Sequence, residues 1–138
     1  MSTKQVLSTS FWSRPGQFGP WSQGIRIPAG HDLLFTTGMT ARDDHGNTVA
    51  PGDPKAQARR IFEQLKALLA EAGATLDDVA QMTVYVHDMD DVLAIQEVRN
   101  EYWPIAPPAS ATVQVARLVS PVVRLEVQAV AVIPKTND

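Results

Sequence analysis

Two segments of the chain repeat apolar residues at the spacing of an α-helix. Asp53 and Pro54 can start the first, because aspartate caps free backbone N–H groups and proline lacks the N–H that the first turn leaves unbonded. Gly73 ends it, and the second segment runs from the residues at 88–91 to Tyr102. The positions expected to face the core are Ile61, Phe62, Leu65, Leu68, Leu69 and Ala72 in the first helix, and Val92, Ile95, Val98 and Tyr102 in the second.

Strands are predicted by alternation and by β-branched composition. Residues 79–87 alternate, and the residues at 108–118 and 123–131 form two β-branched segments around one turn. Residues 25–28 and 33–40 are shorter strand-like segments joined by turn residues, which predicts a hairpin. The strand at 79–87 would place Met82, Val84 and Val86 on one side, and Thr83, Tyr85 and His87 on the other.

The order of these elements predicts an α+β fold, in which a mixed β-sheet carries two helices on one face. A strand–helix–strand connection within one sheet is normally right-handed, so successive helices fall on the same side. The other face would be uncovered, with Val130 and Val132 as its apolar candidates. Burying that face against copies of the same chain removes the exposure, so we expect a homo-oligomer.

Length and composition narrow the class of protein. The 138 residues suit a single domain over residues 1–138. No apolar run approaches the roughly 20 residues that span a bilayer, and residues 1–12 lack the apolar core of a signal peptide. We therefore expect no membrane association and a cytoplasmic location. The net charge of −3 and the scattered basic residues predict that nucleic acid is not a partner.

Motifs for several common chemistries are missing from the sequence. The chain has no cysteine, which excludes disulfides, thiolate zinc sites and cysteine nucleophiles. His31, His45 and His87 have no histidine or glutamate at ligand spacing. The glycines near residues 16–19 lack the pattern of a nucleotide-binding loop, and no serine-hydrolase elbow occurs. We therefore expect neither a metal nor a cofactor.

Four short stretches resemble motifs of the Rid (YjgF/YER057c/UK114) family over roughly residues 19–133. They are Gly19-Pro20-Trp21-Ser22-Gln23, Thr37-Gly38, Pro108-Ala109-Ser110-Ala111-Thr112-Val113-Gln114-Val115-Ala116-Arg117-Leu118, and the strand around Glu126. The resemblance implies the Rid/chorismate-mutase-like fold and a homotrimer with a small-molecule cleft at each subunit junction. It also implies hydrolysis of reactive imines and enamines, or small-molecule binding, without a cofactor.

Three residues would carry the chemistry that the resemblance implies. Glu126 matches a family glutamate that positions or activates the hydrolytic water, although it could instead be a solvated residue paired with Arg124 or Gln128. Ser110 stands where the family's deaminases have an arginine that binds the substrate carboxylate, and Thr112 follows on the same strand face. Two hydroxyls suit a neutral or phenolic group better, because they cannot form the bidentate pair of a guanidinium.

Five further residues are candidates for substrate binding. Trp21 replaces the family's tyrosine and, with Phe18, would cover the substrate; an interface role for Trp21 is equally compatible with the sequence. Thr37 and Gly38 would let a ligand reach backbone N–H groups, although Gly38 could also mark a β-bulge. Gln96 lies near the position of a cleft amide in the family, or is a solvated helix residue.

Two classes of function stay open from the sequence. The first is a small-molecule hydrolase acting in an intersubunit cleft by imine or enamine deamination or a related step on a catabolic intermediate, for which aminomuconate deaminases are one subgroup. The second is a non-catalytic trimeric metabolite-binding protein, which Ser110 favours. Arg117 and Arg124 are the candidate replacements for the missing cation, although Arg117 falls in the family's Val-Ala-Arg-Leu motif, which favours a structural role for it.

Overall fold

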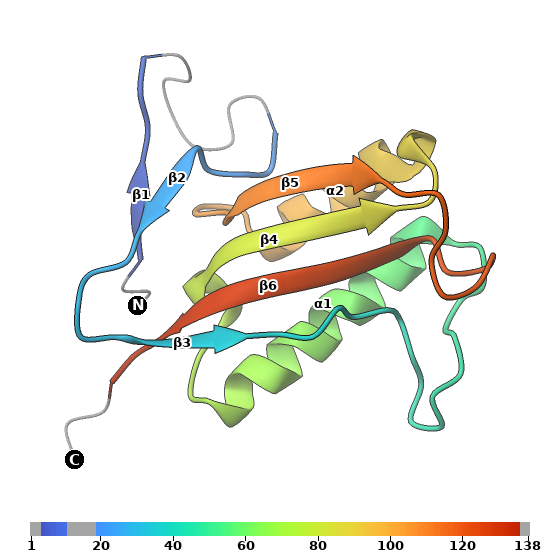
Figure 1. Ribbon diagram of the computed structural model, residues 1–138, viewed down its shortest axis with the longest axis horizontal. Helices are drawn as coiled ribbons and strands as arrows, with labels where there is room; N and C mark the ends of the chain where they lie inside the picture. The colour runs from blue at the N-terminus through green and yellow to red at the C-terminus, as the bar shows by residue number, and fades with distance from the viewer. Residues whose placement is uncertain (1–3, 11–18, 136–138) are drawn as a thin grey trace.

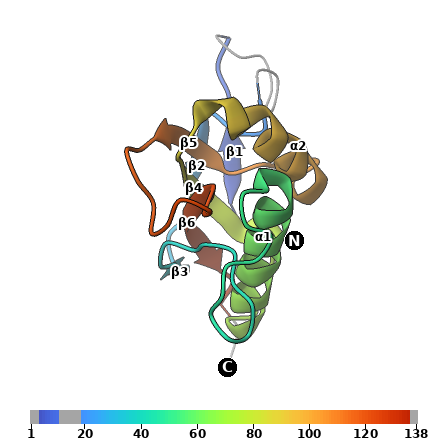
Figure 2. The ribbon, with the colours of Figure 1, turned by 90° about the vertical axis from the view of Figure 1, so that its right-hand side faces the viewer.

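A four-stranded mixed sheet with two helices on one face forms the body of the molecule in the computed structural model, which describes residues 4–10 and 19–135 (Figures 1 and 2). The strands of this sheet lie in the order β3-β6-β4-β5. In chain order the elements are β1 (Gln5–Leu7), β2 (Gly24–Arg26), β3 (Asp32–Phe35), α1 (Pro54–Glu71), the short 3-10 helix η1 (Leu76–Asp78), β4 (Val79–Val86), the 3-10 helix η2 (Met89–Asp91), α2 (Val92–Tyr102), β5 (Ala109–Gln114) and β6 (Leu125–Ile133). The predicted α+β class is confirmed.

The central strand is β4, which is parallel to β5 and antiparallel to β6. The connection from β4 through α2 to β5 is therefore a strand–helix–strand crossover. The two strands predicted around one turn near the end of the chain do not pair with each other, because each pairs with a different edge of β4. The segment between β5 and β6 carries the chain across β4. The outer edge of β5 therefore has no partner strand among residues 4–10 and 19–135, apart from the isolated bridge between Ser22 and Ala109.

The predicted hairpin over residues 25–28 and 33–40 is also wrong. β2 pairs with β1 in a separate two-stranded sheet, whereas β3 pairs with β6 at the opposite edge from β5. Pro28, which has no N–H to donate to a ladder, and the turn at residues 29–30 separate these two strands. The partners of both strands are distant in sequence, so local alternation does not reveal them.

The two helices begin and end close to the predicted residues. The Asp53 carboxylate accepts a hydrogen bond from the Ala56 N–H at 3.1 Å, and Gly73 has a φ of +71°, a conformation that favours glycine after a helix. Ile61 and Leu65 are fully buried, whereas Leu68 is only partly buried. Neither helix has the length and apolar character that a membrane crossing requires, within the described part of the chain.

The sheet face away from the helices carries exposed apolar side chains. Phe35 is 70% exposed, and Leu33 and Val113 also reach solvent on this face. Val130 and Val132 lie on this face as predicted, opposite Phe35 and Leu33, but Val132 is fully buried and Val130 is partly buried. The uncovered face therefore consists of residues of β3 and β5 as well as of β6.

Candidate functional site

Four of the residues singled out from the sequence line one small cavity. Trp21, Gln96, Ser110 and Thr112 surround a volume of about 220 Å³. Ser110 lies opposite Met82 and Thr112 opposite Val84, so both hydroxyls are on the sheet face that the helices cover. Gln96 reaches the cavity from α2. The Ser110 Oγ is buried and has no hydrogen-bond partner within the described residues. We call these four residues the hydroxyl cavity.

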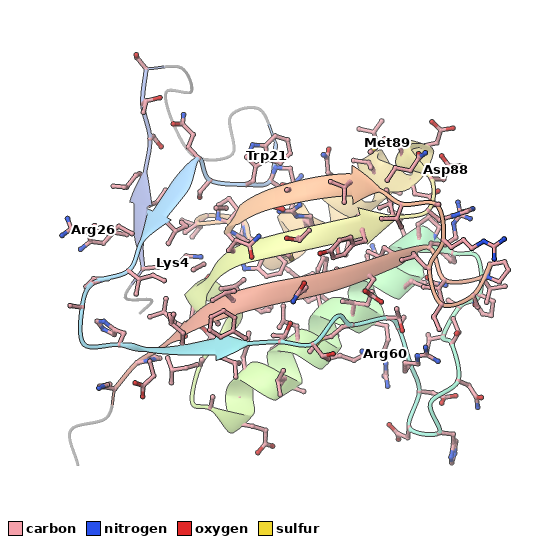
Figure 3. The ribbon with its side chains drawn as sticks, in the orientation of Figure 1. Lys4, Trp21, Arg26, Arg60, Asp88 and Met89 are labelled. Atoms are coloured by element: carbon pink, nitrogen blue, oxygen red, sulfur yellow. The ribbon has the colours of Figure 1, made fainter. Side chains whose placement is uncertain are left out.

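The loop that carries Trp21 is hydrogen-bonded to the residues just before β5. The Ser22 N–H donates to the Pro108 carbonyl at 3.0 Å, and the Ser22 hydroxyl donates to the Pro107 carbonyl at 2.5 Å. A Cβ atom on Gly19 would overlap the indole of Trp21, so the ring lies directly against this glycine. Figure 3 shows Trp21 beside the start of β5. The loop therefore places the indole next to Ser110.

Arg99, a residue to which the sequence analysis gave no role, lies behind this loop. Its side chain is buried, with only 1% exposed, and its Nη2 donates to the Pro20 carbonyl at 2.9 Å. No carboxylate forms an ion pair with it within the described residues, and its Nε has no partner. Burial lowers the pKa of Arg99 to about 10, so the guanidinium stays protonated at neutral pH. The sequence could have indicated the burial of Arg99, because this residue lies next to Val98 within the apolar stripe of α2.

Glu126 and Gly38 form a second cluster on the uncovered face. A Cβ atom on Gly38 would lie 2.7 Å from the Glu126 Oε2, so only glycine leaves room for this carboxylate. Thr36 is hydrogen-bonded to Ala129 and Met39 to Val127, which leaves one extra residue in the segment that contains Gly38. That extra residue is a β-bulge, a feature that often turns side chains toward a site. Gly38 therefore lies in a β-bulge and is also closely approached by another group, so the two interpretations of this glycine are compatible.

The expected alternative partners of Glu126 are engaged elsewhere. Arg124 forms an ion pair with Asp91 at 2.7 Å, and the Tyr85 hydroxyl donates to the Gln128 Oε1 at 3.4 Å. Glu126 lies opposite Tyr85 on the ladder, on the face that carries no helix. Its carboxylate is therefore available to a ligand on that face.

The sheet separates the two clusters within one protomer. Ser110 and Thr112 face the helices, whereas Glu126 faces away from them. Thr37 is exposed beside Gly38, and Phe18 lies outside the described residues. No group of three or more histidine, aspartate or glutamate side chains suited to a metal ion occurs in residues 4–10 and 19–135.

Comparisons with known proteins agree with this fold. The profile of the family described as Endoribonuclease L-PSP matches residues 11–133. A RutC family protein of Pyrococcus abyssi is 37% identical over 128 residues, covering 93% of this chain and 96% of the relative. TdcF of Escherichia coli K12, whose name describes it as a reactive intermediate deaminase, is 33% identical over 132 residues, covering 94% and 97%.

Solved structures of similar proteins have the same arrangement of helices and strands. The Rid family protein YyfB of Yersinia pestis has a TM-score of 0.82 at 26% identity, covering 94% of this chain and 98% of that one. RidA of the Antarctic bacterium Psychrobacter has a TM-score of 0.67 at 28% identity, covering 92% and 98%. The similarity spans both clusters of candidate residues.

Proposed function

Because the chain belongs to the Rid (YjgF/YER057c/UK114) family, we propose that it is a small-molecule hydrolase that deaminates an imine or enamine, or catalyses a related hydrolytic step. The reaction takes place in a cleft between subunits of a cytoplasmic homotrimer, without a cofactor, nucleic acid or membrane. The observation that carries the proposal is the close approach of the Glu126 carboxylate to Gly38 at a β-bulge on the uncovered face. A carboxylate that can reach a bound water molecule is the general base that water activation needs.

The cleft requires two protomers, because one sheet holds its candidate groups on opposite faces. The outer edge of β5, which has no partner strand beyond the Ser22–Ala109 bridge in the described part of the chain, lies next to the hydroxyl cavity. The uncovered face carries the exposed Phe35 and Val113. Packing the β5 edge of one protomer against the uncovered face of the next would bury these apolar side chains. It would also bring the hydroxyl cavity of one subunit to the Glu126 of its neighbour.

Each group has a defined part in the hydrolysis of an imine. The planar substrate stacks on the Trp21 indole, and the hydroxyls of Ser110 and Thr112 hold its polar end. The Glu126 carboxylate takes a proton from a water molecule, whose oxygen attacks the C=N carbon. The nitrogen then takes up the proton held by Glu126 and the proton of the new hydroxyl group, the C–N bond of the tetrahedral intermediate breaks, and a carbonyl compound and ammonia leave. An enamine first becomes the imine by accepting a proton at its β-carbon.

The test follows imine decay directly. Imines generated in situ from several amino acids by an amino acid oxidase are incubated with the protein, and ammonia release is recorded. The wild type should accelerate release, and Glu126→Gln should lower that rate by about 100-fold or more, because general-base catalysis contributes on that order. Glu63→Gln is the matched control, since Glu63 is an exposed residue of α1 on the other side of the sheet.

The competing function is a trimeric metabolite-binding protein without turnover, which the missing arginine at position 110 favours. Wild-type protein that accelerates no imine, yet is stabilised against heat by small acids or phenols, would establish this second function and disprove the first.

A further inference from the structure

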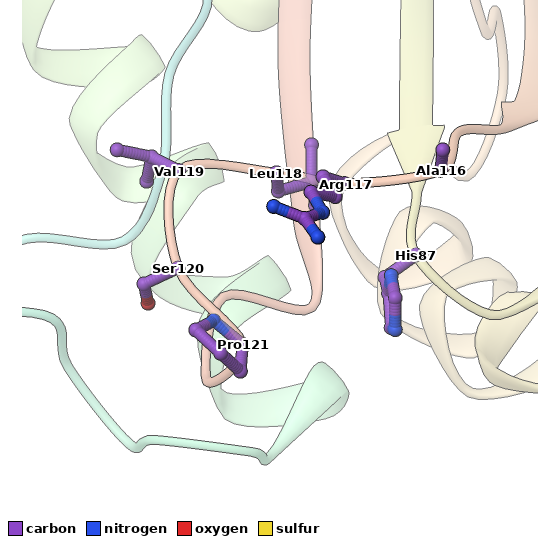
Figure 4. Close-up of a pocket in the computed structure, with 7 residues that line it drawn as sticks. All are labelled: His87, Ala116, Arg117, Leu118, Val119, Ser120 and Pro121. Atoms are coloured by element: carbon purple, nitrogen blue, oxygen red, sulfur yellow. The ribbon is translucent and has the colours of Figure 1, made fainter.

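A larger cavity lies at the end of the sheet, where the loop after β5 crosses the uncovered face. Its volume is about 420 Å³. Figure 2 shows this loop on the side of the sheet away from the helices, and Figure 4 shows the cavity itself. The residues that line it are His87, Ala116, Arg117, Leu118, Val119, Ser120 and Pro121. We call it the loop cavity.

The loop cavity contains one of the two arginines that could replace the missing cation. Arg124 is not available to bind a substrate anion, because it forms ion pairs with Asp91 at 2.7 Å and with Asp88 at 3.9 Å. Arg117 makes no ion pair or hydrogen bond within the described residues, and its exposed side chain supports no structural role within the protomer. Arg117, which has no partner in the described part of the chain, is thus the arginine that lines a cavity.

The charges around the loop cavity favour an anion. Arg117 and His87 extend into the same opening in Figure 4, and none of the seven lining residues is acidic. The neighbouring carboxylates are those of Asp88, which accepts a hydrogen bond from the Asp90 N–H at 2.9 Å and faces Arg124, and of Glu126 on the adjacent strand. The apolar lining residues Leu118 and Val119 suit the hydrocarbon part of an organic acid.

The β-ladder places this cavity next to Glu126. Tyr85 lies opposite Glu126, and the His87 N–H donates to the Arg124 carbonyl at 3.4 Å, so His87 and Arg124 adjoin each other just beyond the last ladder pair. His87 follows Tyr85 by two residues and therefore shares its face. Diagonal neighbours of this kind have Cα atoms about 7–8 Å apart, which a small acid can span.

We propose that Arg117 and His87 bind the carboxylate of the substrate, so that this protein takes an organic acid whose charged end is held by the loop after β5 rather than by residue 110 of that strand. The inference rests on the proposed function, because it assigns the substrate class of the same site. The imine or enamine carbon then lies at Glu126, and the hydrocarbon part of the acid lies on Leu118 and Val119.

Binding of two matched probes tests this assignment without any turnover. Pentanoate and its neutral counterpart pentanamide are titrated at low ionic strength, and the shifts of backbone amide NMR signals report site and affinity. Wild-type protein should bind pentanoate about tenfold more tightly than pentanamide, with shifts at residues 116–120, because a charge-assisted hydrogen bond is worth that ratio. Equal affinity for the two probes would overturn the proposal.

Variants separate the loop cavity from the hydroxyl cavity. Arg117→Met should abolish the preference for pentanoate, Arg117→Lys should keep part of it, and His87→Gln should reduce it. The control is Arg26→Met, because Arg26 is an exposed arginine on β2, far from this loop in Figure 3, and its removal should change nothing. A preference that survives Arg117→Met but is lost in Ser110→Ala would place the anion in the hydroxyl cavity and disprove the proposal.

Glu126→Gln distinguishes this proposal from the proposed function. This variant should lose imine hydrolysis and keep the preference for pentanoate. Absence of hydrolysis in the wild type, together with an Arg117-dependent preference, would remove the reaction but leave the anion site. Hydrolysis in the wild type without that preference would leave the reaction and remove the anion site.

Discussion

Gly38 and Glu126 are in such close contact that a single methyl group on the glycine would lie 2.7 Å from the Glu126 Oε2 and 2.9 Å from its carboxyl carbon. The contact joins the bulge after β3 to the last strand of the sheet. Because the end of a flexible side chain can move, a larger residue at position 38 would shift the carboxylate rather than break the fold. The position of Glu126 therefore depends on the absence of a side chain at Gly38.

Gly38→Ala is expected to lower kcat/KM for imine hydrolysis by about 100-fold, because displacing a catalytic group by an ångström costs on that order. The free energy of unfolding, measured in urea, should change by no more than about 1 kcal/mol. Gly24→Ala is the control, since a Cβ atom there would meet no atom within 4 Å. Equal kinetics for Gly38→Ala and wild type would show that the Glu126 position does not matter for turnover.

Ser110→Arg should increase the rate on 2-iminopropionate, because a guanidinium at this position can bind a carboxylate through two parallel hydrogen bonds. Ser110→Gln is the control for side-chain length without charge. The measurement is kcat/KM from ammonia release under single-substrate conditions. The same rate for the Arg and Gln variants would show that the hydroxyl cavity does not face the substrate carboxylate.

Arg99→Met should destabilise the loop that carries Trp21. The Pro20 carbonyl would lose its 2.9 Å hydrogen bond, and an unsatisfied buried acceptor costs about 1–3 kcal/mol of the free energy of unfolding. Urea unfolding measures that loss. The fluorescence of Trp21, obtained as the difference between each protein and its Trp21→Phe counterpart, should shift to longer wavelength. An unchanged difference spectrum would mean that Arg99 does not position the indole.

The Lys4 ammonium should make stability depend on pH in the alkaline range. Its Nζ donates to the Val79 carbonyl at 2.7 Å and to the Ala106 carbonyl at 2.9 Å, and burial lowers its pKa from 10.5 to about 8. Between these two values the unfolded chain binds more protons than the folded chain, so Lys4 favours folding increasingly as the pH rises.

The Lys4 effect is measured by urea unfolding of wild type and Lys4→Met at about pH 7.5 and about pH 9.5, values on either side of the folded pKa. The difference in free energy of unfolding, wild type minus variant, should become more positive at the higher pH. A constant difference would mean that Lys4 has the same pKa in both states.

Phe35→Glu should weaken self-association, because the side chain is 70% exposed on the uncovered face that the proposed trimer buries. Analytical ultracentrifugation at micromolar concentration should show a trimer for the wild type and a lighter species for the variant. Leu93→Glu is the matched control, since Leu93 is 75% exposed but belongs to α2 on the covered side. A wild-type protein that sediments as a monomer would exclude a site shared between subunits.

Local patterns identified most of the elements, and long-range pairing explains the errors. The stripe of α1 and the alternation of β4 specify which side chains turn inward, because periods of 3.6 and 2 residues are properties of the backbone itself. The pairing of β2 with β1 and of β3 with β6 joins segments far apart in the sequence. No local pattern carries that information, so the predicted hairpin at residues 25–40 was wrong.

For the candidate site, too, some features follow from the sequence and others only from the tertiary structure. The sequence, through its resemblance to a family, indicated eight candidate residues for one cleft. The structure places four of them, Trp21, Gln96, Ser110 and Thr112, around one cavity. Only the tertiary structure put Glu126 on the opposite face of the sheet and buried Arg99 behind the Trp21 loop. It also paired Arg124 and left Arg117 without a partner among residues 4–10 and 19–135. Residue type and spacing determine what a side chain can do, whereas strand register and packing determine which groups it meets.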